Sequence, residues 1–126
     1  IAIGDIDFFK KVNDTYGHNC GDQVLKSLSN LFKEKTLGMG HVCRWGGEEF
    51  LFFFPGINLD HASSIMSEIN IAVSKSVITY KDLTLHVTMT FGVEENDFHS
   101  NISEMVKRAD DKLYYGKTHG RDTVIS

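Results

Sequence analysis

The sequence is poor in the residues that crosslink or interrupt small domains. It has a single proline, Pro55, and two cysteines, Cys20 and Cys43, which are far apart and show no metal-ligand spacing. We therefore expect two free thiols in place of a disulfide or a cysteine-bound metal. With 126 residues, 41% of them hydrophobic, the chain is long enough to fold as one domain around its own core.

The chain also lacks long apolar runs and an excess of positive charge. No stretch approaches the ~20 apolar residues of a membrane-spanning helix, so we expect no membrane contact by this segment. The formal net charge is −4, which argues against a broad basic face for nucleic acid. A nucleotide ligand is not excluded, because it requires only a few local cations. The chain starts inside an apolar run without a methionine, and we expect it to be a piece of a longer polypeptide.

The hydrophobic pattern predicts alternating strands and helices. Strands are expected at residues 1–7, 41–45, 50–54, 83–93 and, as a short edge strand, 123–125. Helical stripes run through residues 24–32, 59–73 and 102–113, and an earlier helix is interrupted near residues 13–21. The apolar run 50–54 favours a strand buried on both faces, whereas the strict alternation in 83–93 favours one covered face.

This order predicts an α+β fold: a mixed, mostly antiparallel sheet of about five strands with flanking helices. In a split β-α-β arrangement, the strand that begins near Glu48 lies antiparallel to the first strand of the chain. Asp5, at the end of that first strand, should then meet Glu48 at one edge of the sheet.

Gly46-Gly47-Glu48-Glu49-Phe50 carries the first chemical signal. Two glycines between apolar runs predict a β-hairpin turn, because glycine reaches positive φ without strain. The two carboxylates favour a hard cation such as Mg²⁺, and glycines without side chains allow a phosphate to approach closely. An ordinary acidic surface hairpin is the alternative for this segment alone.

Asp5 and Asp7 supply the second signal. Clustered carboxylates repel one another unless a divalent cation neutralises them, and Mg²⁺ at such a cluster supports phosphoryl or nucleotidyl transfer. Asp5 and Asp7 share a face only if the strand is still extended there. The alternative is that Asp7 caps the helix that follows.

Two further segments could bind phosphate. Phe8-Phe9-Lys10 lies where a strand gives way to a helix, where free N–H groups and the helix dipole favour an anion. Their aromatic side chains could equally be core residues. Lys117 and Arg121 flank a glycine just after the last helix, which is also the ordinary composition of a helix C-terminus.

Asn13 and Asp22 flank the glycine-interrupted segment. A carboxylate accepts two parallel hydrogen bonds, which matches the N1–H and exocyclic amine of guanine, and an asparagine amide both donates and accepts. Turn or capping roles for both residues, with Asp22 capping the second helix, are the alternative, and His18 reads as a turn residue.

The chain carries four motifs in a fixed order: Asp-Ile-Asp-x-Phe-Lys-x-x-Asn-Asp, Gly-His-x-x-Gly-Asp, Arg-Trp-Gly-Gly-Glu-Glu-Phe and Lys-x-x-Gly-Arg. In this set it resembles the GGDEF family of diguanylate cyclases, in the Gly-Gly-Glu-Glu-Phe form. The resemblance implies a palm-like sheet similar to that of nucleotidyl cyclases. It also implies condensation of two GTP molecules into cyclic di-GMP, with release of pyrophosphate.

The resemblance further implies roles for single residues. Metal ligands for Mg²⁺, or alternatively Mn²⁺, would be Asp5, Glu48 and the carbonyl of Ile6. Glu48 or Glu49 would assist deprotonation of the attacking 3′-hydroxyl, and we favour Glu48. Guanine would be read by Asn13 and Asp22, with His18 as a neighbouring contact. Phosphates would be bound by the amides of Phe8 and Phe9 and by Lys10, Lys117 and Arg121.

The implied partners are GTP, a second copy of the domain facing the first, and a regulatory sensor domain elsewhere in a cytoplasmic or membrane-anchored full-length chain. A catalytically silent GTP-binding module is the alternative function, although the retained carboxylates and Lys10 argue against it. ATP is disfavoured, because the carboxylate of Asp22 suits guanine.

The chain departs from the family pattern in two places. The helix and Asp-x-Leu-Thr-Gly-Leu segment that precede the first strand in relatives are absent, and we expect their loss to expose apolar surface. The Arg-x-x-Asp inhibitory site is replaced by Leu37 and Gly40, so we expect product feedback through that site to be lost.

Overall fold

The computed structural model describes all residues from 1 to 126, and its centre is a five-stranded sheet in the order β2-β3-β1-β6-β7. The β1 strand pairs antiparallel with both β3 and β6, β2 pairs antiparallel with β3, and β7 runs parallel to β6. The predicted α+β fold with a mostly antiparallel sheet is therefore confirmed. The strands are β1 (Ala2–Ile6), β2 (His41–Gly46), β3 (Glu49–Phe53), β6 (Met89–Val93) and β7 (Thr123–Ile125).

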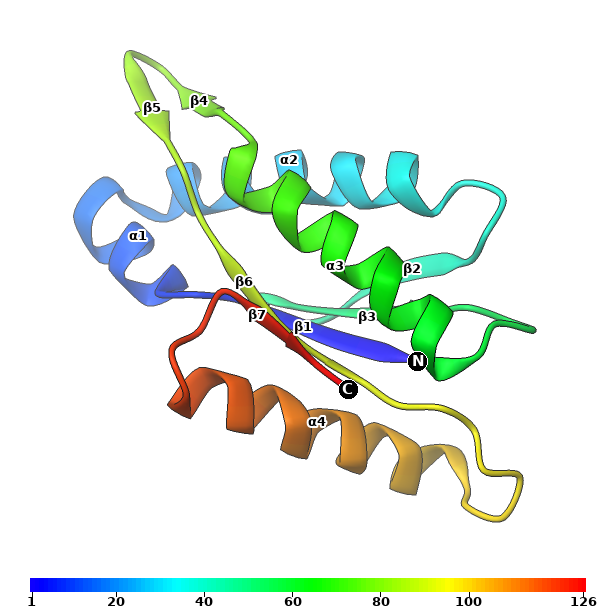
Figure 1. Cartoon of the computed structure of the whole chain (residues 1–126). Helices are drawn as coiled ribbons and strands as arrows, with labels where there is room; N and C mark the ends of the chain where they lie inside the picture. The colour runs from blue at the N-terminus through cyan, green and yellow to red at the C-terminus, as the bar shows by residue number, and fades with distance from the viewer.

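Four helices surround the sheet, and they are α1 (Phe9–Tyr16), α2 (His18–Thr36), α3 (Leu59–Lys75) and α4 (Ile102–Thr118). Figure 1 shows α2 and α3 on one face, α4 alone on the other, and α1 at the end of the sheet where β1 finishes. The predicted apolar stripes of α2, α3 and α4 are the buried sides of these helices.

The two faces of the sheet are covered unequally. The large core lies under α2 and α3, where Phe32 packs edge-on against Phe50 and Phe52 with ring centroids 5.0 Å apart. A much smaller cluster of Ile3, Ala109 and Leu113 lies under α4. The sheet face on the α4 side is therefore only partly covered.

This asymmetry corrects both burial predictions for the strands. In β3, Leu51 is half-buried and Phe53 is 49% exposed, so the strand is not buried on both faces. The reason is that α4 packs on β1, β6 and β7 and leaves the β2–β3 side open. Conversely, all five residues of β6 are buried, because it lies between β1 and β7 with α3 and α4 packed against it.

The single strand predicted at 83–93 is two strands in two different sheets. Its first part is β5 (Leu83–Leu85), which pairs with β4 (Ile78–Tyr80) in a separate hairpin. Lys81 turns this hairpin at a φ of 53°. The alternation of residue types continues from β5 into β6, so periodicity alone did not reveal the break between the two strands.

The interruption predicted between the first two helices is a single residue, Gly17, at a φ of 93°. Asn13 is therefore within α1, and His18 and Asp22 are within α2. The turn and capping roles considered for these three residues are wrong, and no side chain caps the start of α2.

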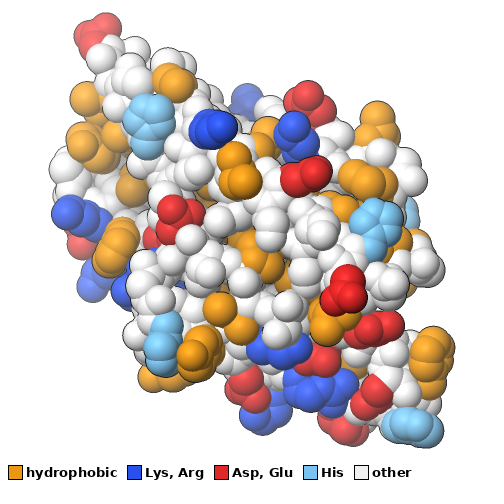
Figure 2. Space-filling model, in the orientation of Figure 1, with side chains coloured by type: hydrophobic (Ala, Val, Ile, Leu, Met, Phe, Trp, Pro, Cys, Tyr) orange, Lys and Arg blue, Asp and Glu red, His pale blue; other side chains and the backbone are white.

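The placement of α4 depends on close contacts with the sheet. A Cβ added to Gly92 in β6 would lie 2.1 Å from the carbonyl oxygen of Ala109, so only glycine permits this approach. Farther along the helix, Lys112 donates to the carbonyl of Val93 at 2.9 Å and pairs with Glu94 at 3.0 Å. Charged side chains gather over α4 and the loop before it, at the lower right of Figure 2. These contacts fix the helix whose last turn carries Lys117.

Two smaller expectations also have outcomes. Cys20 is buried and Cys43 is exposed, and both are free thiols as expected. None of the helices combines the length and apolarity needed to cross a lipid bilayer.

Candidate functional site

The candidate site lies where β1 ends, α1 begins and the β2–β3 hairpin turns. Asp5 is opposite Glu49 in the β1–β3 register, and the Ile6 amide donates to the Glu48 carbonyl at 3.4 Å. Two motifs more than forty residues apart in sequence are thus neighbours at one edge of the sheet. This juxtaposition is the one predicted from the sequence.

The hairpin itself forms differently from the prediction. Gly46 is the last residue of β2, Gly47 and Glu48 make the turn, and neither glycine has a positive φ. A bulge at Trp45 shifts the register, and Arg44 Nε donates to the Gly47 carbonyl at 2.9 Å. A Cβ on Gly47 would meet no atom within 4 Å. The space over this turn is therefore open to a ligand. Gly47 matters here because it has no side chain, and not because its backbone adopts a positive φ.

Asp5 is the most perturbed acid of the site. It is 5% exposed, and its Oδ2 accepts a short hydrogen bond within an ion pair from Lys117 Nζ. Burial raises the pKa of Asp5 to about 6, Lys117 opposes this shift, and the charges of Glu48 and Glu49 add to it. The three carboxylates at this edge therefore favour a bound positive charge, and the ammonium group of Lys117 supplies one.

Asp7 does not join this cluster. It lies just beyond β1, it is 5% exposed, and its carboxylate is turned to β6 and the α4–β7 loop. Oδ2 accepts from the Thr88 hydroxyl at 2.7 Å and from the Asp122 amide at 3.0 Å, and Oδ1 accepts from the Thr90 hydroxyl at 2.7 Å. The helix-capping alternative for Asp7 is wrong, since no side chain caps α1.

The turn between β1 and α1 leaves backbone donors free. The first amides of α1 to find a carbonyl are those of Lys11 and Val12, which donate to Phe8, so the N–H groups of Phe8, Phe9 and Lys10 have no acceptor. Phe9 is buried in the core, but Phe8 is 62% exposed at a φ of 57°. The core alternative is thus correct for Phe9 and wrong for Phe8. Free amides at a helix start favour an anion.

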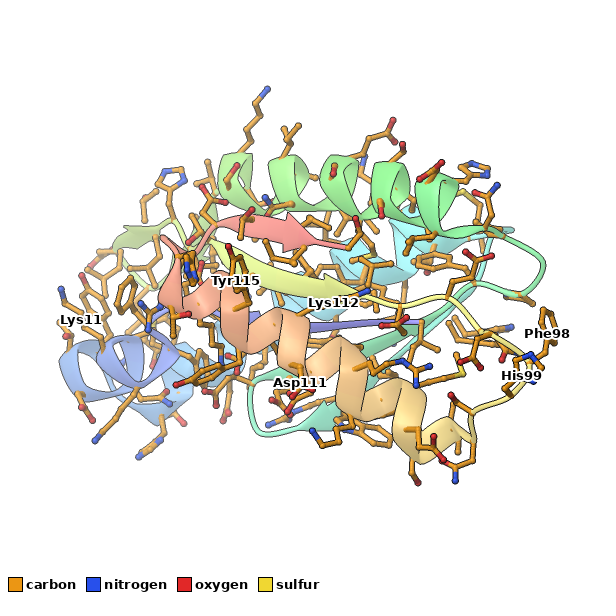
Figure 3. The ribbon with its side chains drawn as sticks, turned by 60° about the horizontal axis from the view of Figure 1, so that its bottom comes forward. Lys11, Phe98, His99, Asp111, Lys112 and Tyr115 are labelled. Atoms are coloured by element: carbon orange, nitrogen blue, oxygen red, sulfur yellow. The ribbon has the colours of Figure 1, made fainter.

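The loop after α4 brings two cations to this turn. Lys117 reaches Asp5, and the Arg121 guanidinium lies 4.6 Å from the centre of the Phe8 ring. Gly120 has a φ of 108°, and Arg121 and Asp122 also have positive φ values of 59° and 45°. Figure 3 shows the end of α4, where Tyr115 is labelled, beside α1, where Lys11 is labelled.

A second group of predicted residues lies at the α1–α2 junction. Asn13 is half-buried, Asp22 is exposed, and His18 is the exposed first residue of α2. A Cβ added to Gly21 would lie 1.9 Å from Asn13 Oδ1, so the Asn13 amide lies directly against the Gly21 backbone. The side chains of Asn13 and Asp22 therefore come from adjoining helices, with Gly21 as the spacer.

The donor set at Asp5 suits a hard divalent cation. The available oxygens are those of Asp5, Glu48 and the Ile6 carbonyl, and oxygen is the ligand type that Mg²⁺ prefers. No group of three or more His, Cys, Asp or Glu side chains is arranged to hold a metal by itself. The residues thus fit a cation that takes part of its coordination from another oxygen-rich ligand, at a carboxylate that also pairs with Lys117.

Sequence reasoning missed two residues of the site, Asp7 as an anchor and Gly21 as a spacer. The only signal for Asp7 was the pair of threonines on alternate positions, Thr88 just before β6 and Thr90 within it.

The family model described as "Diguanylate cyclase, GGDEF domain" matches residues 1–123, and the chain belongs to this family. It is 36% identical over 125 residues to diguanylate cyclase A of Treponema denticola, covering 98% of this chain and 34% of the relative. It is 38% identical over 126 residues to diguanylate cyclase DgcM of Escherichia coli K12, covering 100% of this chain and 30% of the relative. The chain therefore spans about a third of the length of these relatives.

Solved structures agree with this assignment. The GGDEF domain of DgcB from Caulobacter crescentus, in complex with c-di-GMP, superimposes with a TM-score of 0.93 at 31% identity, covering 98% of this chain and 74% of that one. The active GGEEF domain of a diguanylate cyclase from Vibrio cholerae gives a TM-score of 0.89 at 28% identity, covering 98% and 79%.

Proposed function

We propose that this domain condenses two GTP molecules into cyclic di-GMP and releases pyrophosphate. The observation that carries the proposal is the meeting of Asp5, the Glu48-Glu49 hairpin, Lys117 and the open start of α1 at one edge of the sheet. Family membership and the names of the relatives support the same reaction.

In this proposal the triphosphate binds at the β1–α1 turn. The free amides of Phe8, Phe9 and Lys10 donate to phosphate oxygens, and the side chains of Lys10, Lys117 and Arg121 neutralise charge. Asn13 and Asp22 hydrogen-bond the guanine edge, with His18 close by. A site that pairs with N1–H and the exocyclic amine would reject adenine, because its polar groups would then lack partners.

Asp5, Glu48 and the Ile6 carbonyl would hold Mg²⁺, or Mn²⁺ in its place. When bound, such a cation neutralises the carboxylates and polarises phosphate oxygens. Lys117, which pairs with Asp5, would then be available to neutralise a phosphate oxygen.

The reaction takes place twice, once in each direction: the 3′-oxygen of each GTP forms a bond to the α-phosphorus of the other, and each α-phosphorus loses its bond to the bridging oxygen of a leaving pyrophosphate, so that two pyrophosphates are released. The 3′-hydroxyl proton passes to a carboxylate of the hairpin, Glu48 or Glu49, with Glu48 favoured. Each domain holds one GTP, so two copies must face each other across the hairpin edge. Such positioning supplies roughly 7–11 kcal/mol of the barrier.

The second candidate is a GTP-binding module without turnover that regulates a partner. The retention of Asp5, Glu48 and Lys10 favours the enzyme, because these are groups that the proposed reaction requires. A regulatory sensor domain in the full-length chain and a cytoplasmic location belong to the same proposal.

Incubation of the domain, alone and fused to a parallel dimerisation helix, with GTP and Mg²⁺ tests this function. We expect cyclic di-GMP and pyrophosphate from the fusion protein, and none from Glu48→Gln at unchanged thermal stability. Glu68→Gln, an exposed glutamate on α3, is the matched control and should retain full activity. GTP binding without product would favour the silent module, and absence of GTP binding would refute both functions.

A further inference from the structure

Asp7 is a buried charged group that the proposed chemistry leaves unused. Both of its oxygens accept hydrogen bonds, from the Thr88 and Thr90 hydroxyls and the Asp122 amide. Asp7 forms no ion pair with a Lys or Arg side chain, and its carboxylate is not part of the cluster of Asp5, Glu48 and Glu49. A buried carboxylate is expensive to retain unless its hydrogen bonds are satisfied, as they are here.

Among these hydrogen bonds, the one from the Asp122 amide has a functional consequence. It belongs to the α4–β7 loop, which is 115 residues away in sequence. Arg121 and Asp122 both have left-handed backbone conformations, at φ values of 59° and 45°, which residues with side chains adopt rarely. A loop with this backbone conformation is retained only where its surroundings hold it. Here the Asp7 carboxylate accepts a hydrogen bond from the amide of Asp122, the second of the two left-handed residues.

Arg121 occupies its position because of this loop shape. Its guanidinium lies over the Phe8 ring, next to the turn whose amides have no acceptor. Phe8 follows Asp7 directly, so one short segment supplies both the anchor of the loop and the surface on which Arg121 rests.

We infer that Asp7 is a positioning residue for the triphosphate: it acts through the Asp122 amide to hold Arg121 beside the phosphate-binding turn. Asp7 itself touches no substrate. The inference rests on the proposed function, since that function gives Arg121 its phosphate. It predicts that losing Asp7 weakens binding of the polyphosphate and leaves binding through the guanine unchanged.

The test compares Asp7→Ala with the wild type in binding two ligands in the presence of Mg²⁺: the unreactive α,β-methylene analogue of GTP, and GMP. We expect the dissociation constant for the analogue to rise about tenfold and that for GMP to change less than twofold. Asp7→Asn should recover most of the affinity, because its amide oxygen can accept from Asp122 and its amino group can donate to Thr90. Thr84→Val, an exposed threonine of β5, is the control for hydroxyl removal.

The Arg121→Ala background separates positioning from a general structural role. There Asp7→Ala should change analogue binding less than twofold, because the group that it positions is gone. An equal loss for analogue and GMP, or an undiminished loss in the Arg121→Ala background, would overturn the inference. If Asp7→Ala does not fold, Thr88→Val replaces it. A threefold loss for the analogue alone then supports the inference, and no loss or an equal loss for both ligands overturns it.

Trypsin gives a readout that needs no nucleotide. Cleavage after Arg121, detected by mass spectrometry of the fragment that begins at Asp122, should be faster in Asp7→Ala than in the wild type. An unchanged rate would show that Asp7 does not hold the loop, whatever the domain binds. A wild type that binds neither ligand would instead refute the proposed function, and with it the phosphate role of Arg121.

Discussion

Replacing Asp5 by asparagine should stabilise the nucleotide-free fold at neutral pH, although it removes a carboxylate that the proposed function assigns to the metal. The Asp5 carboxylate is buried, and its pKa in the folded protein is about 6, compared with 3.8 for an ordinary aspartate. The folded state thus binds this proton more tightly than the unfolded state. Between pH ~4 and ~6 the contribution of Asp5 to the free energy of unfolding falls as pH rises, and above this range it stays low.

The magnitude follows from the same difference in pKa. The interval from 3.8 to about 6 corresponds to on the order of 3 kcal/mol between the neutral and ionised carboxyl. Asparagine has the shape of the neutral acid and keeps an oxygen for Lys117. The stability difference between Asp5→Asn and the wild type should therefore be near zero at pH 4 and reach up to about 3 kcal/mol at pH 7.5.

Urea unfolding at pH 4, 5, 6 and 7.5 with EDTA measures this difference. Asp110→Asn, at an exposed aspartate of α4, is the matched control for the substitution itself. A stability difference for Asp5→Asn that does not grow with pH would refute the reasoning. A less stable variant at pH 7.5 would show that the ion pair with Lys117 outweighs the desolvation of Asp5.

Three further predictions concern guanine recognition and assembly. Gly21→Ala should weaken GTP binding, measured by calorimetry, because its Cβ would lie 1.9 Å from Asn13 Oδ1; unchanged affinity would count against Asn13 as a guanine contact. Asp22→Ala should reduce the preference for GTP over ATP in competition binding, a preference that we expect to reach ~10⁴ in the wild type; equal binding of both nucleotides by the wild type would exclude Asp22 as the reader. Specific activity of the unfused domain should rise with protein concentration, because the proposed mechanism requires two facing domains for each product, and constant activity on dilution would contradict that mechanism.

Much of the fold followed from the sequence because its signals are local and periodic. The apolar stripes placed α2, α3 and α4, and the glycine pair placed the β2–β3 hairpin. Once the strand order was assumed, pairing brought Asp5 opposite the hairpin carboxylates, because antiparallel register fixes which residues are neighbours. The sequence did not reveal the break between β5 and β6, because apolar and polar residues alternate in the same way on both sides of the break.

The sequence alone determined which chemical groups are present and in what order, and the four motifs were sufficient to indicate the family. It did not determine what each carboxylate faces. Asp5 and Asp7 are two residues apart and were candidates for one cluster, yet one contacts Lys117 and the other contacts Thr88, Thr90 and Asp122.

Only the tertiary structure decided this division, because the partners of both residues are more than 80 residues away in sequence, in β6 and the residue before it, in α4 and in the loop after α4. Long-range packing sets those contacts: glycine at position 92 lets α4 approach the sheet, and the left-handed turn at Arg121 directs its side chain over Phe8. Hydrophobic periodicity records which side of an element is buried, but it contains no information on which distant polar group a buried carboxylate will meet.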